Sequence, residues 1–182
     1  MKRKERINFK TYTQIKNIGI KDFSINFKRR NIADYLINQT DILVINLYRD
    51  NSLKRLISLA AMQTTGVVAL KKNHKSQKLH LPTEKILNQL EVFEQEKDEQ
   101  FEMIESLPES RVMNISYESY FIDSHQQDNI NQQILDFLGV DALAINSKHQ
   151  KILSSSLSNI LENYDEVCKV LLKTKYEKYL EN

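Results

Sequence analysis

The chain has few of the residues that break or crosslink a polypeptide. Its 182 residues include three glycines, two prolines, one cysteine and no tryptophan. So little glycine and proline favours a helix-rich architecture over a turn-dense all-β fold. The single cysteine, Cys168, excludes an internal disulfide, which fits a reducing cytoplasm. Together with four scattered histidines, one cysteine gives no support for a metal site.

Further absences narrow the chemistry. Gly19, Gly66 and Gly139 lie too far apart to form a glycine-rich phosphate loop, and no Gly-x-Ser-x-Gly nucleophile turn occurs. No apolar run approaches the ~20 residues that span a bilayer, and the N-terminus lacks the apolar stretch of a signal peptide. We therefore expect a soluble cytoplasmic protein without a membrane or metal partner, whose anion sites use arginine, lysine, serine and helix starts.

Charge is distributed unevenly along the chain, although the net charge is only +2. Residues 1–30 contain ten lysines and arginines against two acids, whereas residues 82–109 contain nine acids against two lysines. The basic end could attract nucleic acid or a phosphorylated ligand, but a solvated tail explains it more simply. We expect residues 1–15 to form a flexible basic N-terminus and residues 16–182 to form one domain. Nucleic acid is an unlikely partner because no recognisable binding module occurs.

Hydrophobic periodicity predicts a mixture of strands and helices after this tail. Strands are predicted at 15–23, 42–48 and 111–117, and helices at 27–38, about 52–65, 83–105, 129–138 and within 157–179. Two strands joined through a long helix suggest a right-handed crossover in a parallel sheet. The predicted fold class is therefore α/β and helix-rich, with a short, mostly parallel sheet flanked by helices.

Residues 41–66 form the central unit of the chain, a strand, a tight turn and a helix. Residues 42–48 are rich in β-branched and large apolar residues, as in a strand buried on both faces, and residues 49–52 offer helix-capping side chains. In α/β sheets such a turn lies at the carboxyl edge, where ligands bind. Arg49 at the strand end and Ser58 on the helix could hold an anion together with N–H groups of the helix start. The plainer alternative is an ordinary strand–helix unit with a solvated arginine.

The pattern from Leu47 to Ser58 is a strand end followed by Arg-x-Asn-x-Leu-x-Arg-x-x-Ser. It resembles the 3'-phosphate-binding segment of bacterial-type sulfotransferases that use 3'-phosphoadenosine 5'-phosphosulfate. In that family an arginine ending a core strand and a serine on the next helix grip the nucleotide's 3'-phosphate. The resemblance assigns these two roles to Arg49 and Ser58.

Other segments resemble the same family in order and spacing. They are 18–21, 63–66, 115–118, 134–140 and 163–166. The resemblance places Tyr117 near the adenine, although a packed strand-end aromatic is the simpler explanation. The resemblance also suggests that Lys151 corresponds to a basic residue that lies beside the nucleotide in the family.

The resemblance covers about residues 16–180 and implies part of a P-loop-NTPase-like three-layer fold. It implies sulfonyl transfer from the nucleotide donor to a hydroxylated acceptor such as a carbohydrate. The family's 5'-phosphosulfate loop, often followed by its catalytic base, should precede Ile18, and the seventeen residues there contain no such loop. The chain thus resembles the C-terminal two-thirds of a sulfotransferase, and activity would need a separate N-terminal fragment, with a homo-oligomer as another possible partner.

Two alternatives to a sulfotransferase stay open. One is a non-catalytic module that binds a phosphorylated ligand through Arg49, Ser58 and the basic residues 71–78. The other is an interaction protein whose acidic helix, residues 83–105, contacts a partner. No catalytic or metal-ligating residue is assigned from the sequence under any of these interpretations.

Overall fold

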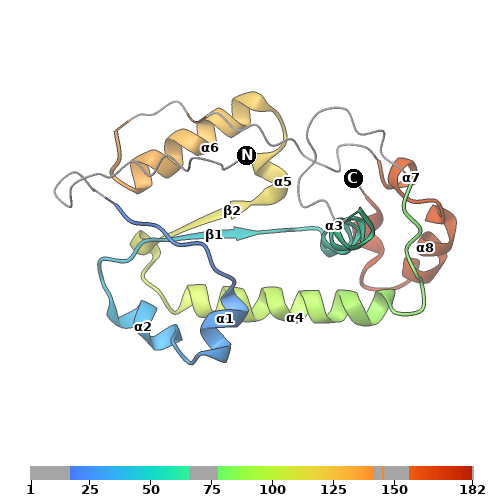
Figure 1. The fold of residues 1–182 in the computed structure, drawn as a ribbon, viewed down its shortest axis with the longest axis horizontal. Coiled ribbons are helices and arrows are strands. Elements are labelled where there is room, and N and C mark those ends of the chain that lie inside the picture. Colours follow the sequence, from blue (N-terminus) through green and yellow to red (C-terminus); the bar gives the residue numbers. More distant parts are fainter. Residues whose placement is uncertain (1–16, 66–77, 142–144, 146–155, 182) are drawn as a thin grey trace, which may run out of the picture.

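Two short parallel strands form the sheet of this protein, and helices make up most of the remaining structure (Figure 1). The computed structural model describes residues 17–65, 78–141, 145 and 156–181. The strands are β1 (Val44–Tyr48) and β2 (Val112–Ser116), and they pair in parallel over their whole length. The prediction of a helix-rich α/β chain with a short parallel sheet is confirmed at this level.

Helices cover both faces of the strand pair, with α4 along one face and α6 on the other (Figure 1). The α-helices are α1 (Ser24–Arg29), α2 (Ala33–Asn38), α3 (Ser52–Thr65), α4 (Ile86–Glu105), α5 (Tyr117–Tyr120), α6 (Ser124–Phe137), α7 (Leu157–Ile160) and α8 (Tyr164–Leu171). Two 3-10 turns, η2 (Glu109–Arg111) and η3 (Glu177–Leu180), complete the described elements. Within the described ranges, no helix is long and apolar enough to cross a membrane.

Two predictions for the N-terminal part of the domain were wrong. The described part of the strand expected at 15–23 has no regular structure, and Ile18 and Ile20 are 79% and 87% exposed because no neighbouring strand covers them. The single helix expected at 27–38 is two helices, α1 and α2. Asn31 lies between them with a φ of 52°, a left-handed conformation that asparagine tolerates and that interrupts the helix.

The prediction that β1 is buried on both faces was also wrong. On the α4 face Asn46 is buried, but on the opposite face Ile45 and Leu47 are 38% and 54% exposed. Helix α6 lies over β2 on that face, where Ile115 is buried, and so leaves β1 partly uncovered (Figure 1). The apolar run of β1 therefore reflects a strand with one well-covered face.

The main hydrophobic core holds α3 against α4 and the C-terminal helices. Its fully buried side chains are Leu53, Ile57, Ile86, Leu90, Leu161, Val167 and Leu171. An isolated parallel bridge between Leu79 and Leu161 ties the segment before α4 to the C-terminal part. The side chain of Asn163 strengthens this join, since it binds both the N–H and the carbonyl of Leu81 at 3.0 and 2.9 Å.

Arg111 joins α2 to the start of β2 through a buried guanidinium group. It is only 6% exposed, and it donates to the carbonyls of Leu36, Ile37 and Ile42 at 2.6, 3.3 and 3.0 Å. Two of these carbonyls belong to the last turn of α2, where a helix presents unpaired acceptors and attracts positive charge. Arg111 therefore acts as a cap that fixes α2 beside the sheet.

We expect Arg111→Met to lower the free energy of unfolding by about 2–4 kcal/mol, because it leaves three carbonyls without their donor. Urea unfolding measured by circular dichroism would give this change. Arg29→Met is the matched control, since Arg29 is exposed at the end of α1 and its loss should change stability by less than about 0.5 kcal/mol. Equal losses in both variants would contradict the capping role of Arg111.

Candidate functional site

The register of the strand pair brings the two strand ends to one edge of the sheet. Tyr48 pairs with Ser116, so the next residues, Arg49 and Tyr117, leave the strands side by side. The guanidinium carbon of Arg49 lies 4.0 Å from the centroid of the Tyr117 ring, a cation–π contact. Two of the four residues singled out from the sequence therefore meet at the carboxyl edge.

Arg49 is also fixed by the helix that follows it. Its Nη1 donates to the carbonyl of Lys54 at 2.9 Å. In an α-helix this carbonyl faces the N–H of Ser58, one turn further on, and the Cβ of Ser58 tilts back toward the same turn. The guanidinium group therefore contacts the first turn of α3, one turn before Ser58, which is half-buried.

The other predicted site residue, Lys151, lies outside the described residues. No metal ligands were assigned from the sequence, and the described residues contain no group of three or more histidine, cysteine or acidic side chains placed to hold a metal ion. The site that can be built from these residues thus centres on Arg49.

Hydrogen bonds lock the two turns at this edge together. The Ser116 hydroxyl donates to the Asp50 carboxylate, and the Asp50 N–H donates to Glu118 Oε2 at 2.9 Å. Burial first, and then the negative charges of Asp50 and Glu118, raise the pKa of the Tyr48 hydroxyl. Nothing in the sequence pattern indicated this lock, because it joins residues more than sixty positions apart.

The start of α3 is capped by the protein itself. Asn51 Oδ1 accepts from the Lys54 N–H at 2.9 Å, and Asn51 Nδ2 donates to the carbonyl of Tyr179 at 3.0 Å. The Ser52 hydroxyl donates to the Glu94 carboxylate of α4. The capping role expected for this turn is present. Of the N–H groups of the helix start, which were expected to help hold an anion, that of Lys54 is already bonded.

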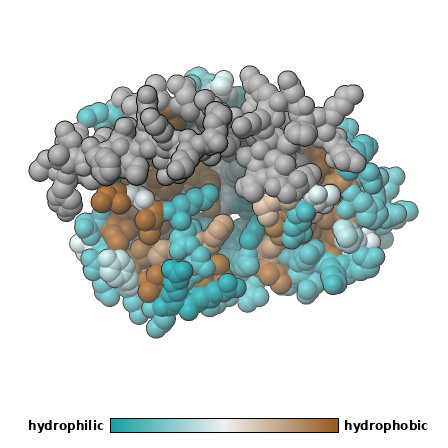
Figure 2. All heavy atoms as spheres, in the orientation of Figure 1, coloured by the Kyte–Doolittle hydropathy of each residue, from teal (hydrophilic) through white to brown (hydrophobic). Residues whose placement is uncertain are grey.

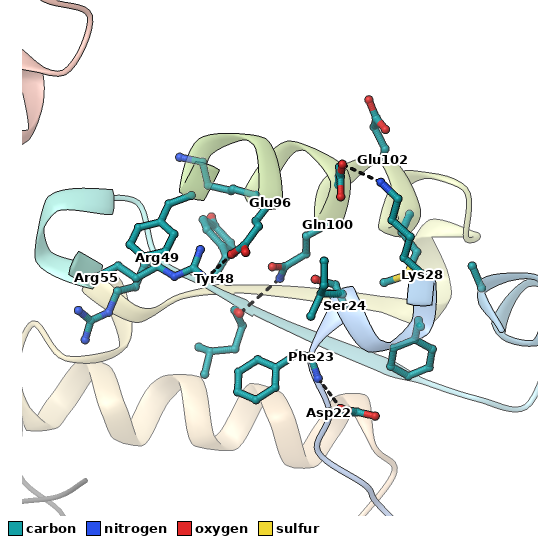
Figure 3. A pocket seen from close by; sticks show the side chains of 18 of the residues that line it. Asp22, Phe23, Ser24, Lys28, Tyr48, Arg49, Arg55, Glu96, Gln100 and Glu102 are labelled. Atoms are coloured by element: carbon teal, nitrogen blue, oxygen red, sulfur yellow. Dashed lines mark hydrogen bonds and ion pairs between the residues drawn. The ribbon is translucent and has the colours of Figure 1, made fainter. Parts of the chain in front are cut away.

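A cavity of about 660 Å³ opens beside Arg49. It lies between the end of β1, the middle of α4 and the start of α1, and Figure 3 shows the side chains that line it. Tyr48 and Arg49 lie at the β1 end, while Phe23, just before α1, and Gln100 of α4 approach from the other sides (Figure 3). Tyr117 also lines the cavity. Its volume is within the usual range for small-molecule sites.

Arg49 differs from the other basic residues of this cavity. The other three are each paired with a carboxylate of α4: Arg55 with Glu96, Lys28 with Glu99 and Lys97 with Glu94. Among the described residues, no carboxylate oxygen lies within ion-pair distance of the Arg49 guanidinium group, which is held by a carbonyl and an aromatic ring. Its positive charge is therefore available to an anionic ligand.

The fold is that of an α/β protein with Arg49 beside Tyr117 at the carboxyl edge of a parallel strand pair. The chain matches no protein-family model, no curated protein and no solved structure. A function is therefore proposed from the chemistry of Arg49 and of the cavity beside it.

If Ser58 is available to a ligand, Ser58→Ala should lower the free energy of unfolding by less than about 1 kcal/mol. Leu56→Ala on the same helix should cost about 2–5 kcal/mol, because Leu56 is buried in the main core. Thermal or urea unfolding of the two variants would measure the difference. A Ser58→Ala protein as unstable as Leu56→Ala would show that this serine is a packing residue.

The Glu94 carboxylate makes the stability of the folded protein depend on pH. Burial raises the pKa of this carboxyl group. Hydrogen bonds, chiefly the one from Ser52, and the positive charge of Lys97 lower it by more, so the pKa lies below the ordinary 4.5. Its contribution to stability is therefore complete above that ordinary value and lost as the pH falls through the lower folded-state pKa.

We expect the stability difference between the wild type and Glu94→Gln to shrink as the pH falls from about 6 to about 3. Urea unfolding at several pH values would measure this difference. Glu84→Gln removes an exposed carboxylate just before α4 and serves as the control, with little effect at any pH. A difference for Glu94→Gln that is the same at every pH would contradict the assignment.

Proposed function

We propose that this chain binds the sulfate donor 3'-phosphoadenosine 5'-phosphosulfate through Arg49 and serves in sulfonyl transfer to a hydroxylated acceptor. The observation that supports this most is the Arg49 guanidinium at the end of β1, 4.0 Å from the Tyr117 ring and without a carboxylate partner among the described residues. The finer fold, part of a P-loop-NTPase-like three-layer arrangement, belongs to the same proposal.

The residues at the strand edge suit the 3'-phosphate end of this nucleotide. Arginine has five N–H donors in a planar group, and Arg49 uses one on the Lys54 carbonyl, so others can bind two phosphate oxygens at once. The Ser58 hydroxyl would donate to the same phosphate from the next turn of α3. Lys151 remains a predicted further contact to the nucleotide.

Tyr117 would meet the nucleotide in a particular way. Arg49 contacts its ring, and the Phe121 ring packs against it with centroids 4.6 Å apart. Since these neighbours occupy the ring, a nucleotide near Tyr117 would contact its edge or hydroxyl. Its main effect on binding would be to hold Arg49.

Sulfonyl transfer needs an acceptor hydroxyl in line with the sulfur, a base for its proton and positive groups near the sulfonate oxygens. The donor supplies the sulfonyl group, and the bond between its sulfur and the 5'-phosphate oxygen breaks as the acceptor oxygen bonds to sulfur. In this proposal Arg49 and Ser58 hold the far end of the donor and so fix its position. We assign no catalytic base to the described residues.

We expect Arg49→Ala to weaken the binding of 3'-phosphoadenosine 5'-phosphate by about 10- to 100-fold, since it removes charge-assisted hydrogen bonds to phosphate. Isothermal titration calorimetry would measure the dissociation constants. Adenosine 5'-phosphate lacks the 3'-phosphate, so it should bind more weakly and lose little in Arg49→Ala.

Arg55→Ala is the matched control for this experiment. Arg55 begins the second turn of α3, but it is paired with Glu96, so its loss should change nucleotide affinity less than about threefold. No binding of the bisphosphate at millimolar concentration, or equal losses in both variants, would disprove the role of Arg49. Transfer of labelled sulfate to an added alcohol would then separate an enzyme from a binding module.

A further inference from the structure

We infer that the cavity beside Arg49 binds an uncharged molecule with an aromatic or other apolar body and a hydroxyl group. The cavity lies between β1, α4 and α1, and its volume of about 660 Å³ suits a compact organic ligand. The binding of this molecule is inferred from the lining of the cavity alone. Its role as the sulfonyl acceptor rests in addition on the proposed function.

The apolar part of the lining is left without cover by the fold. Phe23 from the start of α1 and Leu47 from β1 line the cavity and are 70% and 54% exposed. Phe93 and Met103 of α4 line the same space. Figure 2 shows apolar side chains reaching the surface over the α1–α2 side of the molecule. A ligand with an apolar body would remove this surface from water, which favours binding.

The charges of the lining cancel. Its basic residues are Lys28, Arg49, Arg55 and Lys97, and its acidic residues are Asp22, Glu96, Glu99 and Glu102. Ion pairs with α4 carboxylates neutralise three of the four basic side chains. The walls around the apolar space therefore favour a ligand body without a strong charge. Among the described residues of the lining, Arg49 is the basic residue that has no carboxylate partner.

Three hydroxyl groups of the described lining can direct a ligand hydroxyl. Ser24, Tyr48 and Tyr117 line the cavity, and none of their hydroxyl groups has a hydrogen bond to another described residue. Gln100 is already engaged, since its Nε2 donates to Asn46 Oδ1 and, at 3.5 Å, to the carbonyl of Leu47. The exposed apolar walls favour an aromatic alcohol over a carbohydrate, which would cover them less well and would need many more hydrogen bonds.

The test is a fluorescence titration of the full chain with 2-naphthol as the probe. The chain has no tryptophan, so the emission of the probe can be followed directly. We expect saturable binding that weakens about tenfold in Phe23→Ser and in Leu47→Asn, because each removes an apolar wall. Both side chains are largely exposed, so both variants should fold, which thermal unfolding would verify.

Ile122→Ser is the matched control, because Ile122 is 69% exposed but does not line the cavity. Its affinity for 2-naphthol should equal that of the wild type. An absence of saturable binding, or equal weakening in Ile122→Ser and Phe23→Ser, would overturn the inference. The inference would also be overturned if cellobiose displaced 2-naphthol at a lower concentration than phenol does.

The same proteins titrated with 3'-phosphoadenosine 5'-phosphate separate this inference from the proposed function. Phe23→Ser should keep the wild-type nucleotide affinity while its affinity for 2-naphthol falls. Nucleotide binding without 2-naphthol binding would overturn the cavity assignment and leave the Arg49 proposal standing. Binding of 2-naphthol without nucleotide would support the cavity and remove the acceptor role.

Discussion

The parallel register of β1 and β2 is the constraint on which the rest of the site depends. Asn46 pairs with Asn114 in this register, and its side-chain amide donates to Asn114 Oδ1 at 2.7 Å. A slip by one residue would turn these amides and every other side chain of one strand to the opposite face. The hydrogen bond from the buried Asn46 amide to Asn114 therefore favours this register, and the register places Arg49 beside Tyr117.

The hydrophobic core provides the second fixed point. Leu53 and Ile57 are fully buried, so α3 cannot rotate without exposing them, and the Lys54 carbonyl keeps its position next to β1. Arg49 is thus held by one group from each strand–helix unit, a carbonyl from the first and an aromatic ring from the second. A side chain ordered before a ligand arrives loses less conformational entropy on binding.

Sequence patterns predicted the elements that have a single apolar stripe and missed those set by distant contacts. Helices α3 and α4 followed from their periodicity, and the position of Arg49 followed from the end of an apolar run. Periodicity could not show that Asn31 would adopt a left-handed conformation and divide a helix in two. Nor could it show the cavity, because Phe23, Leu47 and Phe93 come from segments that only folding brings together.

The basic residues that line the cavity differ in their interaction partners, and this difference explains why Arg49 suits an anion. A guanidinium group paired with a carboxylate must give up that partner before it can bind phosphate, as Arg55 would have to leave Glu96. An aromatic ring holds a guanidinium group through a weaker attraction that leaves its N–H donors free. Tyr117 therefore positions Arg49 without neutralising it, and the carboxylates of α4 neutralise the other basic side chains of the cavity. Among the described basic residues of the cavity, the one without a carboxylate partner therefore lies at the edge where the two strands end.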